Sequence, residues 1–334
     1  MRPQHSAGQR VNPVYMNRLR FALASLALLV LLGSLVLSGP ASATFSGGNG
    51  RIAWGLFNAG GGGGGGFASL TTYPADRSRG KRIGYCPEDN DGNVCSNWQN
   101  VSYSPDGRHL LWDQTGASGA EVITLANSDA TNLQTITSDS FDDSQASFSG
   151  DGREIVYVRQ TKGAGGLFGT LVIRNLSNAN SRVVKPSIRG AEPLFSPGGK
   201  TILFVRPDKY GYPAGLWSIR PDGHGLRLLA AHISVFDISP NGKSIAYVTV
   251  GGGVFIARSD GSHARRIARK PTGDLPTSAV RFSPDGKLIA FTAMASTGPG
   301  LYVIKASGGK PRLIFDSEDP RNVTTGLSWQ PLRP

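Results

Sequence analysis

The sequence is poor in the residues and motifs that usually mark a catalytic or metal centre. Its 334 residues include two cysteines and five histidines, and the histidines show no metal-ligand spacing. The G-x-S-x-G nucleophile elbow, the H-E-x-x-H zinc motif and the phosphate-binding P-loop are absent. These absences argue against the enzyme classes that such motifs identify. We expect no cofactor.

The two cysteines, Cys86 and Cys95, are nine residues apart in the sequence. In an exported protein such a pair most often forms a disulfide, which here would close the loop 87–94. A redox-active or metal-binding pair is the alternative, although the spacing is not C-x-x-C and no histidine is nearby. We therefore expect a structural disulfide.

A helical period of useful length is missing outside the first 43 residues. Residues 1–20 are basic, residues 21–37 are apolar, and a glycine–proline pair then leads to an A-S-A sequence that ends at Ala43. These are the parts of a secretory signal peptide, so we expect cleavage after Ala43. The alternative is an uncleaved membrane anchor, although the apolar run is short for a bilayer span. We expect an exported protein, periplasmic or extracellular, with one domain at 44–334.

The basic charge of the chain is spread over most of its length. The formal charge of +12 falls to +8 without the four arginines of the leader. A mildly basic surface favours anionic neighbours in general. The Arg265-Arg266 pair has no interleaved aromatic residues, so we interpret it as a solvated turn and strand edge and expect no nucleic-acid partner.

One short phrase returns six times along the chain. Its clearest copy begins at Phe282 and reads F-S-P-D-G-K-L-I-A-F, an aromatic residue followed by a turn and an apolar run. A period of about 40–50 residues is that of a four-stranded propeller blade. Each repeat is interpreted as strands A to D, with the S-P-D-G turn between A and B. The six copies begin at Tyr103, Phe148, Phe195, Ile238, Phe282 and Trp329, at successive intervals of 45, 47, 43, 44 and 47 residues.

The two ends of the repeat region are complementary. Residues 50–54 read as a strand B with no strand A before it, and residues 325–331 read as a strand A with nothing after it. Together they make one complete repeat. The sequence therefore predicts an all-β, six-bladed β-propeller, closed by pairing of the C-terminal strand with the N-terminal blade.

The phrase F-S-P-D-G-K-x-I-A-F, followed by L-Y-V-x-x-x-x-G-x-x-x-x-L, resembles the TolB-type, WD40-like (PD40) β-propeller repeat. The resemblance covers about residues 47–331. The WD40 signature itself is absent, because Trp112-Asp113 lies on a B strand, and the S-x-D-x-G box of sialidases is absent too. We expect the chain to lack the α/β domain that precedes the TolB propeller. The resemblance implies an exported propeller that binds proteins in the envelope.

Function is expected where the repeats differ, on the face that carries the B–C and D–A loops. Asp142, Asp143, Glu318 and Asp319 could hold calcium or contact a basic partner. The plainer interpretation, which we favour over calcium, is that they cap turns and solvate the surface. Trp98, Tyr210 and Tyr212 could form an aromatic platform for a peptide or a sugar, or pack the loops.

Two further candidates lie on or beside the A strands. Asp237 and Arg281 occupy equivalent positions just before the repeat aromatic in adjacent blades. They could form a polar site in the channel, or an inter-blade ion pair. His232 precedes an A strand and could approach the loop face.

The sequence favours a non-enzymatic, monomeric scaffold that binds a protein or peptide of the envelope. The alternative is a glycan hydrolase or lyase with two carboxylates at the channel mouth, within about 5–10 Å of each other. No membrane contact is expected beyond the signal segment.

Overall fold

The computed structural model describes residues 45–58, 67–75, 79–87, 99–161, 168–186, 188–207, 213–249, 253–268, 279–295, 298–318 and 322–332. Every described residue belongs to one compact unit, Leu37–Pro334. The described secondary structure consists of 24 strands without a helix, which confirms the all-β prediction. No helix that could span a membrane occurs in these ranges. The expected signal peptide, 1–43, lies outside them and stays a prediction.

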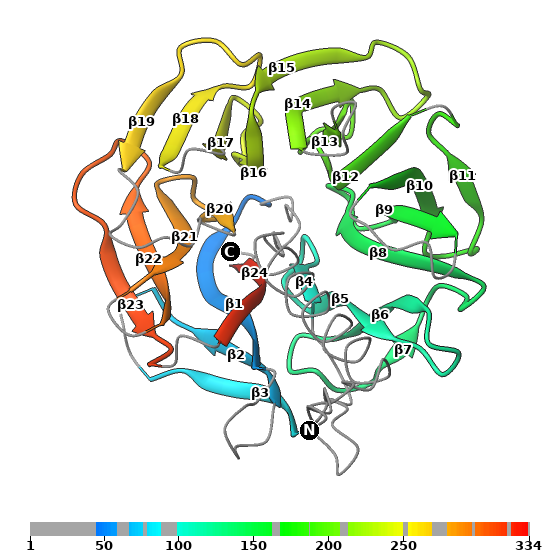
Figure 1. Ribbon diagram of the computed structural model, residues 1–334, viewed down its shortest axis with the longest axis horizontal. Coiled ribbons are helices and arrows are strands. Elements are labelled where there is room, and N and C mark those ends of the chain that lie inside the picture. Colours follow the sequence, from blue (N-terminus) through cyan, green and yellow to red (C-terminus); the bar gives the residue numbers. More distant parts are fainter. Residues whose placement is uncertain are drawn as a thin grey trace, which may run out of the picture. The chain divides into compact units, whose positions relative to one another are not determined.

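The strands are arranged around a common centre, with every fourth strand innermost (Figure 1). The inner strands (A) are β4 (Gln99–Tyr103), β8 (Phe141–Phe148), β12 (Arg189–Phe195), β16 (Ile233–Ile238), β20 (Val280–Phe282) and β24 (Asn322–Leu332). The B strands are β1 (Gly48–Asn58), β5 (His109–Thr115), β9 (Glu154–Thr161), β13 (Ile202–Pro207), β17 (Ser244–Thr249) and β21 (Leu288–Met294). The C strands are β2 (Phe67–Tyr73), β6 (Glu121–Asn127), β10 (Gly169–Asn175), β14 (Pro213–Ile219), β18 (Val254–Arg258) and β22 (Pro299–Lys305). The outer strands (D) are β3 (Lys81–Pro87), β7 (Gln134–Thr135), β11 (Ser181–Val183), β15 (Arg227–Ala231), β19 (Arg265–Ala268) and β23 (Arg312–Asp316).

Successive strands of a repeat pair antiparallel in four four-stranded sheets and one eight-stranded sheet. The larger sheet consists of two four-stranded halves that are joined by a two-residue pairing of β10 with β12. The last strand, β24, pairs with the first, β1, from Gly48↔Leu332 to Asn58↔Asn322. Because strands alternate in direction, the A–B and C–D connections lie at one end of each sheet, here called the turn face. The B–C and D–A connections lie at the other end, the loop face.

Each A–B turn is held by its own side chains. In the turn 283–287, Ser283 Oγ donates to Asp285 Oδ1 (2.6 Å) and accepts from Leu288 N (2.9 Å). Gly286 N donates to the Ser283 carbonyl at 2.8 Å, with Gly286 at φ 70°. Positive φ is the conformation that glycine adopts without steric cost. The turns that begin at Ser104, Ser149 and Ser239 have the same serine-centred contacts.

The core lies between the faces of neighbouring sheets. The repeat aromatics Tyr103, Phe148, Phe195 and Phe282 are at most 2% exposed. Burying one such side chain contributes about 1.5–3 kcal/mol. One core cluster combines Trp54 of β1 with Leu301 of β22, so residues of different sheets share one apolar layer. The aromatic of the repeated phrase is therefore a packing residue.

The turn face is packed from one sheet to the next. A Cβ on Gly107 would overlap the carbonyl oxygen of Pro331. Gln330 Nε2 donates to the Gly107 carbonyl at 2.9 Å. Near the other end of the chain, Asp285 N donates to Asn49 Oδ1 at 3.1 Å. Between two A–B turns, a Cβ on Gly150 would likewise overlap the carbonyl oxygen of Pro197, so turns of neighbouring sheets also contact each other.

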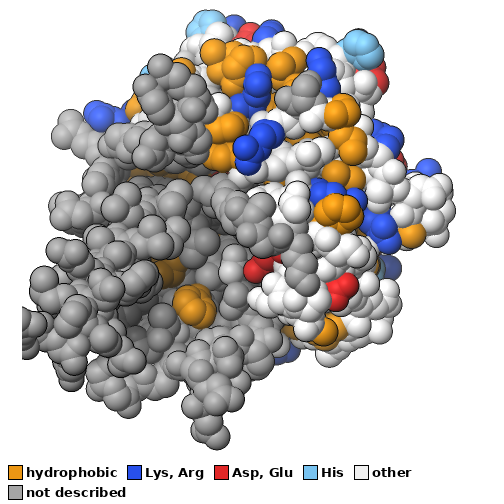
Figure 2. All heavy atoms as spheres, turned by 45° about the vertical axis from the view of Figure 1, so that its right-hand side comes forward, with side chains coloured by type: hydrophobic (Ala, Val, Ile, Leu, Met, Phe, Trp, Pro, Cys, Tyr) orange, Lys and Arg blue, Asp and Glu red, His pale blue; other side chains and the backbone are white. Residues whose placement is uncertain are grey.

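The outer strands carry arginines that reach the next sheet. Arg182 of β11 donates to the Pro221 carbonyl at 2.9 Å, and Arg265 of β19 donates to the Ala306 carbonyl at 2.9 Å. Arg312 of β23 makes the equivalent bond to the Ala75 carbonyl. Figure 2 shows Lys and Arg side chains among hydrophobic ones on one side of the molecule. Short strands and basic side chains discourage edge-to-edge association.

Candidate functional site

Several predicted site residues lie outside the described part of the chain. These are Trp98, Tyr210, Tyr212, Asp319 and Cys95. The backbone of Cys86 belongs to β3, but its side chain is not described. The aromatic platform and the Cys86–Cys95 disulfide therefore stay predictions.

Asp237 and Arg281 are both completely buried, on the neighbouring inner strands β16 and β20. Asp237 Oδ2 accepts a hydrogen bond from Phe282 N at 2.7 Å, so this carboxylate holds the backbone of the next inner strand. Arg281 Nη1 donates to the Val280 carbonyl at 2.6 Å. Burial lowers the pKa of Arg281 to about 10, and the charges of Asp237 and Glu192 oppose that shift.

Further polar side chains, which the sequence did not point to, also accept hydrogen bonds from backbone N–H groups of a neighbouring inner strand. Asp113 of β5 accepts hydrogen bonds from the Asn100 side chain and, at 2.7 Å, from Gln145 N of β8. Gln145 Oε1 in turn accepts from Glu192 N of β12 at 2.7 Å. Together with Asp237 and Arg281 these residues form a set that we call the inner polar cluster. Its members are Asp113 of β5 and five residues of the inner strands, Asn100, Gln145, Glu192, Asp237 and Arg281.

Three members of this cluster have a left-handed backbone. Asn100, Gln145 and Glu192 have φ values of 59°, 59° and 52°. Each lies at a register shift of its inner strand, as expected for a β-bulge. Non-glycine residues with positive φ are uncommon and carry strain that the surrounding contacts must offset. The signal in the sequence was their common position, three residues before the repeat aromatics.

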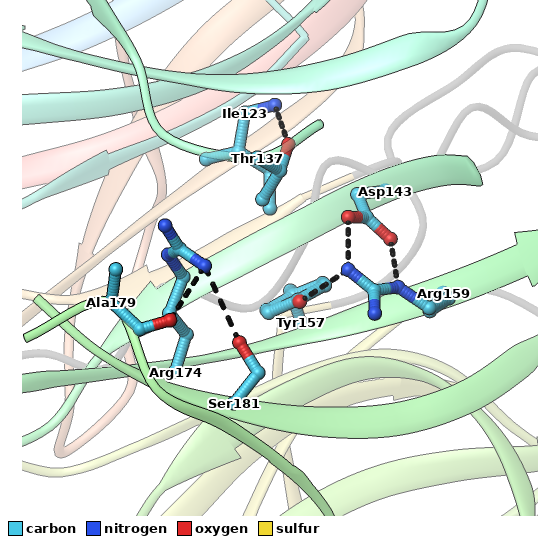
Figure 3. A network of polar contacts seen from close by, with 8 residues as sticks. All are labelled: Ile123, Thr137, Asp143, Tyr157, Arg159, Arg174, Ala179 and Ser181. Atoms are coloured by element: carbon cyan, nitrogen blue, oxygen red, sulfur yellow. Dashed lines mark hydrogen bonds and ion pairs between the residues drawn. The ribbon is translucent and has the colours of Figure 1, made fainter. Parts of the chain in front are cut away.

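Asp143 lies in β8, whereas the sequence analysis placed it in a loop. Its carboxylate accepts two hydrogen bonds from Arg159 of β9, both at 2.7 Å, and Arg159 also donates to Tyr157 Oη at 2.8 Å (Figure 3). Arg159 also stacks over the Phe141 ring, 4.6 Å from its centroid. Burial raises the pKa of Asp143, and the bonds from Arg159 oppose the rise. The pair is a charge-assisted, bidentate contact between neighbouring strands.

Asp142 is also a strand residue and faces β6. Its Oδ1 atom accepts a hydrogen bond from Glu121 N at 3.1 Å. Burial, and then the charge of Asp142, raise the pKa of Glu121. Two carboxyl side chains with different environments thus lie close together near the loop face.

His232 and Glu318 are exposed residues of the D–A connections, each with positive φ (57°). Glu318 N donates to Asp316 Oδ1 at 3.2 Å, so the Asp316 carboxylate caps a turn. Within the described ranges, no group of three or more His, Cys, Asp or Glu side chains is arranged to hold a metal ion.

Comparison with known proteins identifies the fold. No family model and no curated protein matches the chain. TolB from Acinetobacter baumannii is similar in structure, with a TM-score of 0.60 and 18% identity over 86% of this chain and 68% of TolB. A putative TolB from Agrobacterium tumefaciens gives 0.58 and 16%, over 85% and 100% of the two chains. A chain of a nidogen–laminin complex gives 0.62 and 11%, also over 85% and 100%. The fold is a TolB-like β-propeller.

In this propeller the inner polar cluster lies on the inner strands β4, β8, β12, β16 and β20 and on the adjoining strand β5. Its carboxyl and amide groups accept hydrogen bonds from backbone N–H groups of neighbouring sheets. Burial raises the pKa of Asp113 well above its ordinary value, opposed by the bonds from Asn100 and Gln145. These contacts fix the position of one sheet relative to the next. Glu121 and Asp142 near the loop face, by contrast, are partly exposed to solvent, so a ligand could reach them.

Proposed function

We propose that the chain is an exported, six-bladed β-propeller that binds a protein or peptide of the cell envelope through its loop face. Six blades are supported by the six sets of inner and outer strands, and a closed ring is supported by the pairing of β24 with β1. Export is supported by the leader at 1–43.

The difference between the two faces carries the proposal. The A–B connections of the turn face, which are 104–108, 149–153, 196–201, 239–243 and 283–287, are five or six residues long. The D–A connections of the loop face that lie wholly within the described residues range from a single residue, His232, to the five residues 136–140. Loops of different length on a rigid scaffold are the usual place for a binding site. The short turns are already in contact with one another.

The inner polar cluster has a structural role, and this supports binding at the surface rather than at the cluster. Asp113, Gln145 and Asp237 accept backbone N–H groups of adjacent strands. Their polar atoms serve the scaffold, which leaves recognition to the loops. The fold suits such a role, since one structural neighbour belongs to a complex of two proteins, nidogen and laminin.

Site-specific photocrosslinking in the native envelope tests the proposal. A benzoylphenylalanine at Phe141, which is 41% exposed beside the loop face, should give one dominant protein adduct. The same group at Lys243, an exposed residue of an A–B turn, is the matched control and should not give that adduct. The same adduct from both positions, or a dominant adduct from Lys243 alone, would contradict the assignment of the loop face.

A glycan hydrolase or lyase is the second candidate, favoured by the pair Glu121 and Asp142. A carboxyl group with a raised pKa beside a second carboxylate is the arrangement that glycosidases use. If the propeller is such an enzyme, the purified protein will depolymerise an envelope polysaccharide, and Glu121→Gln will abolish turnover. Turnover that survives Glu121→Gln would exclude this pair as the catalytic one.

A further inference from the structure

An open pocket of about 540 Å³ lies at the outer edge of the molecule, between the sheet of β1, β2 and β3 and the outer strand β23. Its volume falls in the range of small-molecule sites, about 300–1,000 Å³. It is distinct from the inner polar cluster and from Phe141, and its lining comes from described residues. These are Thr71, Tyr73, Arg79, Gly80, Arg82, Ile314 and Phe315.

One wall of the pocket is cationic. Arg79 and Arg82 line it, both exposed, and Lys81 lies between them in the chain. Among the described residues that line the pocket, none is acidic. A concave surface with positive charges of one sign attracts an anion, and arginine matches the geometry of phosphate and carboxylate.

The lining also contains aromatic rings. The rings of Tyr73 and Phe315 lie 4.9 Å apart, and Trp54 packs edge-on against Phe315 at 5.3 Å. Burial raises the pKa of Tyr73 to about 12, so its phenol carries no negative charge at neutral pH. A partly exposed ring such as Phe315 offers a flat face for another ring.

The basic and aromatic parts of the lining are held in place by further contacts. Arg51 Nη2 donates to the Thr72 carbonyl (2.7 Å) and to the Arg79 carbonyl (3.4 Å), which spans the connection from β2 to β3. Arg312 fixes the same connection from β23 through the Ala75 carbonyl. A Cβ on Gly80 would overlap the Tyr73 ring, so glycine lets the basic segment approach that ring.

We propose that this pocket binds a phosphate or carboxylate group carried on a ring, with the anion on Arg79 and Arg82 and the ring against Phe315. The ligand is either a free small molecule or the anionic headgroup of a lipid, since both present the same chemistry. The site goes beyond the proposed function, because it uses outer strands and none of the loop-face residues.

Calorimetric titration of residues 44–334 with three probes tests this inference. Phenyl phosphate should bind saturably, and at least tenfold more tightly than inorganic phosphate or phenol alone. Because the attraction is electrostatic, its affinity should fall as salt rises. The absence of saturable binding, or equal binding of phenyl and inorganic phosphate, would overturn the proposal.

Variants locate the site. Arg79→Gln/Arg82→Gln should weaken phenyl phosphate at least tenfold, and Phe315→Leu should weaken it severalfold while inorganic phosphate is unchanged. Arg108→Gln/Arg153→Gln removes the same charge from exposed positions on other sheets and should bind as the parent does. Equal loss in both double variants would contradict the assignment, and thermal unfolding of each variant separates lost binding from lost folding.

Vesicles containing phosphatidylinositol, whose headgroup carries its phosphate on a ring, identify the source of the ligand. Vesicle binding that phenyl phosphate displaces, and that Arg79→Gln/Arg82→Gln loses, assigns the pocket to a lipid headgroup. Phenyl phosphate binding without vesicle binding assigns it to a free ligand. Vesicle binding that phenyl phosphate does not displace would contradict the pocket. Crosslinking from Phe141 does not depend on Arg79 or Arg82. The loop-face proposal and the anion-pocket proposal can therefore be contradicted independently of each other.

Discussion

The A–B turns and the inner polar cluster both supply acceptors for backbone N–H groups, but they draw on different parts of the chain. In a turn, Ser283 and Asp285 bind N–H groups within five residues of themselves. In the cluster, Asp237 binds the N–H of Phe282, 45 residues away and in another sheet. The turn is therefore a property of a short sequence, and the cluster is a property of the assembled sheets. The same turn sequence can therefore recur in each repeat. The residues of the cluster, in contrast, must differ according to the interface between each pair of neighbouring sheets.

The largest loss of stability is expected when the charged residue Arg281 of the inner polar cluster is replaced. Arg281→Met keeps most of the bulk but leaves Asp237 and Glu192 without the buried cation that they attract. Removing one partner from a buried charge set costs about 3–5 kcal/mol, which urea unfolding should show as a lower free energy of unfolding. Lys243→Met, on an exposed A–B turn, is the control and should stay within about 0.5 kcal/mol of the parent. A loss below about 1 kcal/mol for Arg281→Met would show that the cluster is not a structural unit.

The packing of the turn face can be separated from its backbone conformation. Gly107 and Gly199 have φ values of 68° and 69°, but a Cβ on Gly107 would overlap Pro331, and a Cβ on Gly199 meets open space. Gly199→Ala should cost about 1–2 kcal/mol, the price of a left-handed alanine. Gly107→Ala should cost about 1–3 kcal/mol more, because the neighbouring backbone must move. Chemical denaturation of both variants makes the comparison, and equal losses would mean that the turns do not support one another.

A buried carboxyl of the cluster should respond to pH with a definite sign. Since the pKa of Asp113 is raised, the folded protein binds this proton more tightly than the unfolded chain does. Its ionisation therefore lowers stability as pH rises from the ordinary value of 3.8 through the folded pKa. Asp113→Asn keeps an acceptor for Asn100 and Gln145, so its advantage in unfolding free energy over the parent should grow with pH.

Truncation of the same side chain to alanine should instead destabilise the protein. Asp113→Ala leaves two buried donors unsatisfied and should lose about 1–3 kcal/mol at low pH, where the parent carboxyl is protonated. This loss should shrink as pH rises and the parent carboxyl ionises. Urea unfolding at a series of pH values measures both variants. An Asn variant whose advantage shrinks as pH rises would contradict the raised pKa.

The smallest effects should come from the turn serines. Ser283→Ala removes the acceptor of Leu288 N and the donor to Asp285, at a cost of about 1 kcal/mol. Ser239→Ala removes the equivalent contacts to Ser244 N and Asn241. The two losses in unfolding free energy should agree within a few tenths of a kcal/mol. Losses that differ by more than about 1 kcal/mol would mean that the turns are not equivalent units.

The contrast also explains how far the sequence could predict this molecule. The turn at Ser283 and the strands beside it follow from local residue chemistry, and the all-β prediction is confirmed. The incomplete repeats at the two ends pointed to the pairing of β1 with β24, which is present.

The site was predicted less well, because its contacts join distant parts of the chain. Asp237 and Arg281 were found from their equivalent positions, but Asp113 was seen only as part of a misplaced tryptophan–aspartate pair. Asp143 was placed in a loop, although it pairs with Arg159 inside a sheet. A polar residue in a strand meets its hydrogen-bond partner only when the neighbouring strands pair in the correct register. A short stretch of sequence does not determine that register.

The central claim is that the loop face recognises a partner and the turn face does not. Hydrogen exchange of the propeller, alone and bound to the protein captured from Phe141, tests it most directly. We predict protection of the loop-face connections 136–140 and His232 on binding, and unchanged exchange in the turns 104–108 and 239–243. Protection of the turns, with unchanged exchange in the loop-face connections, would contradict the account.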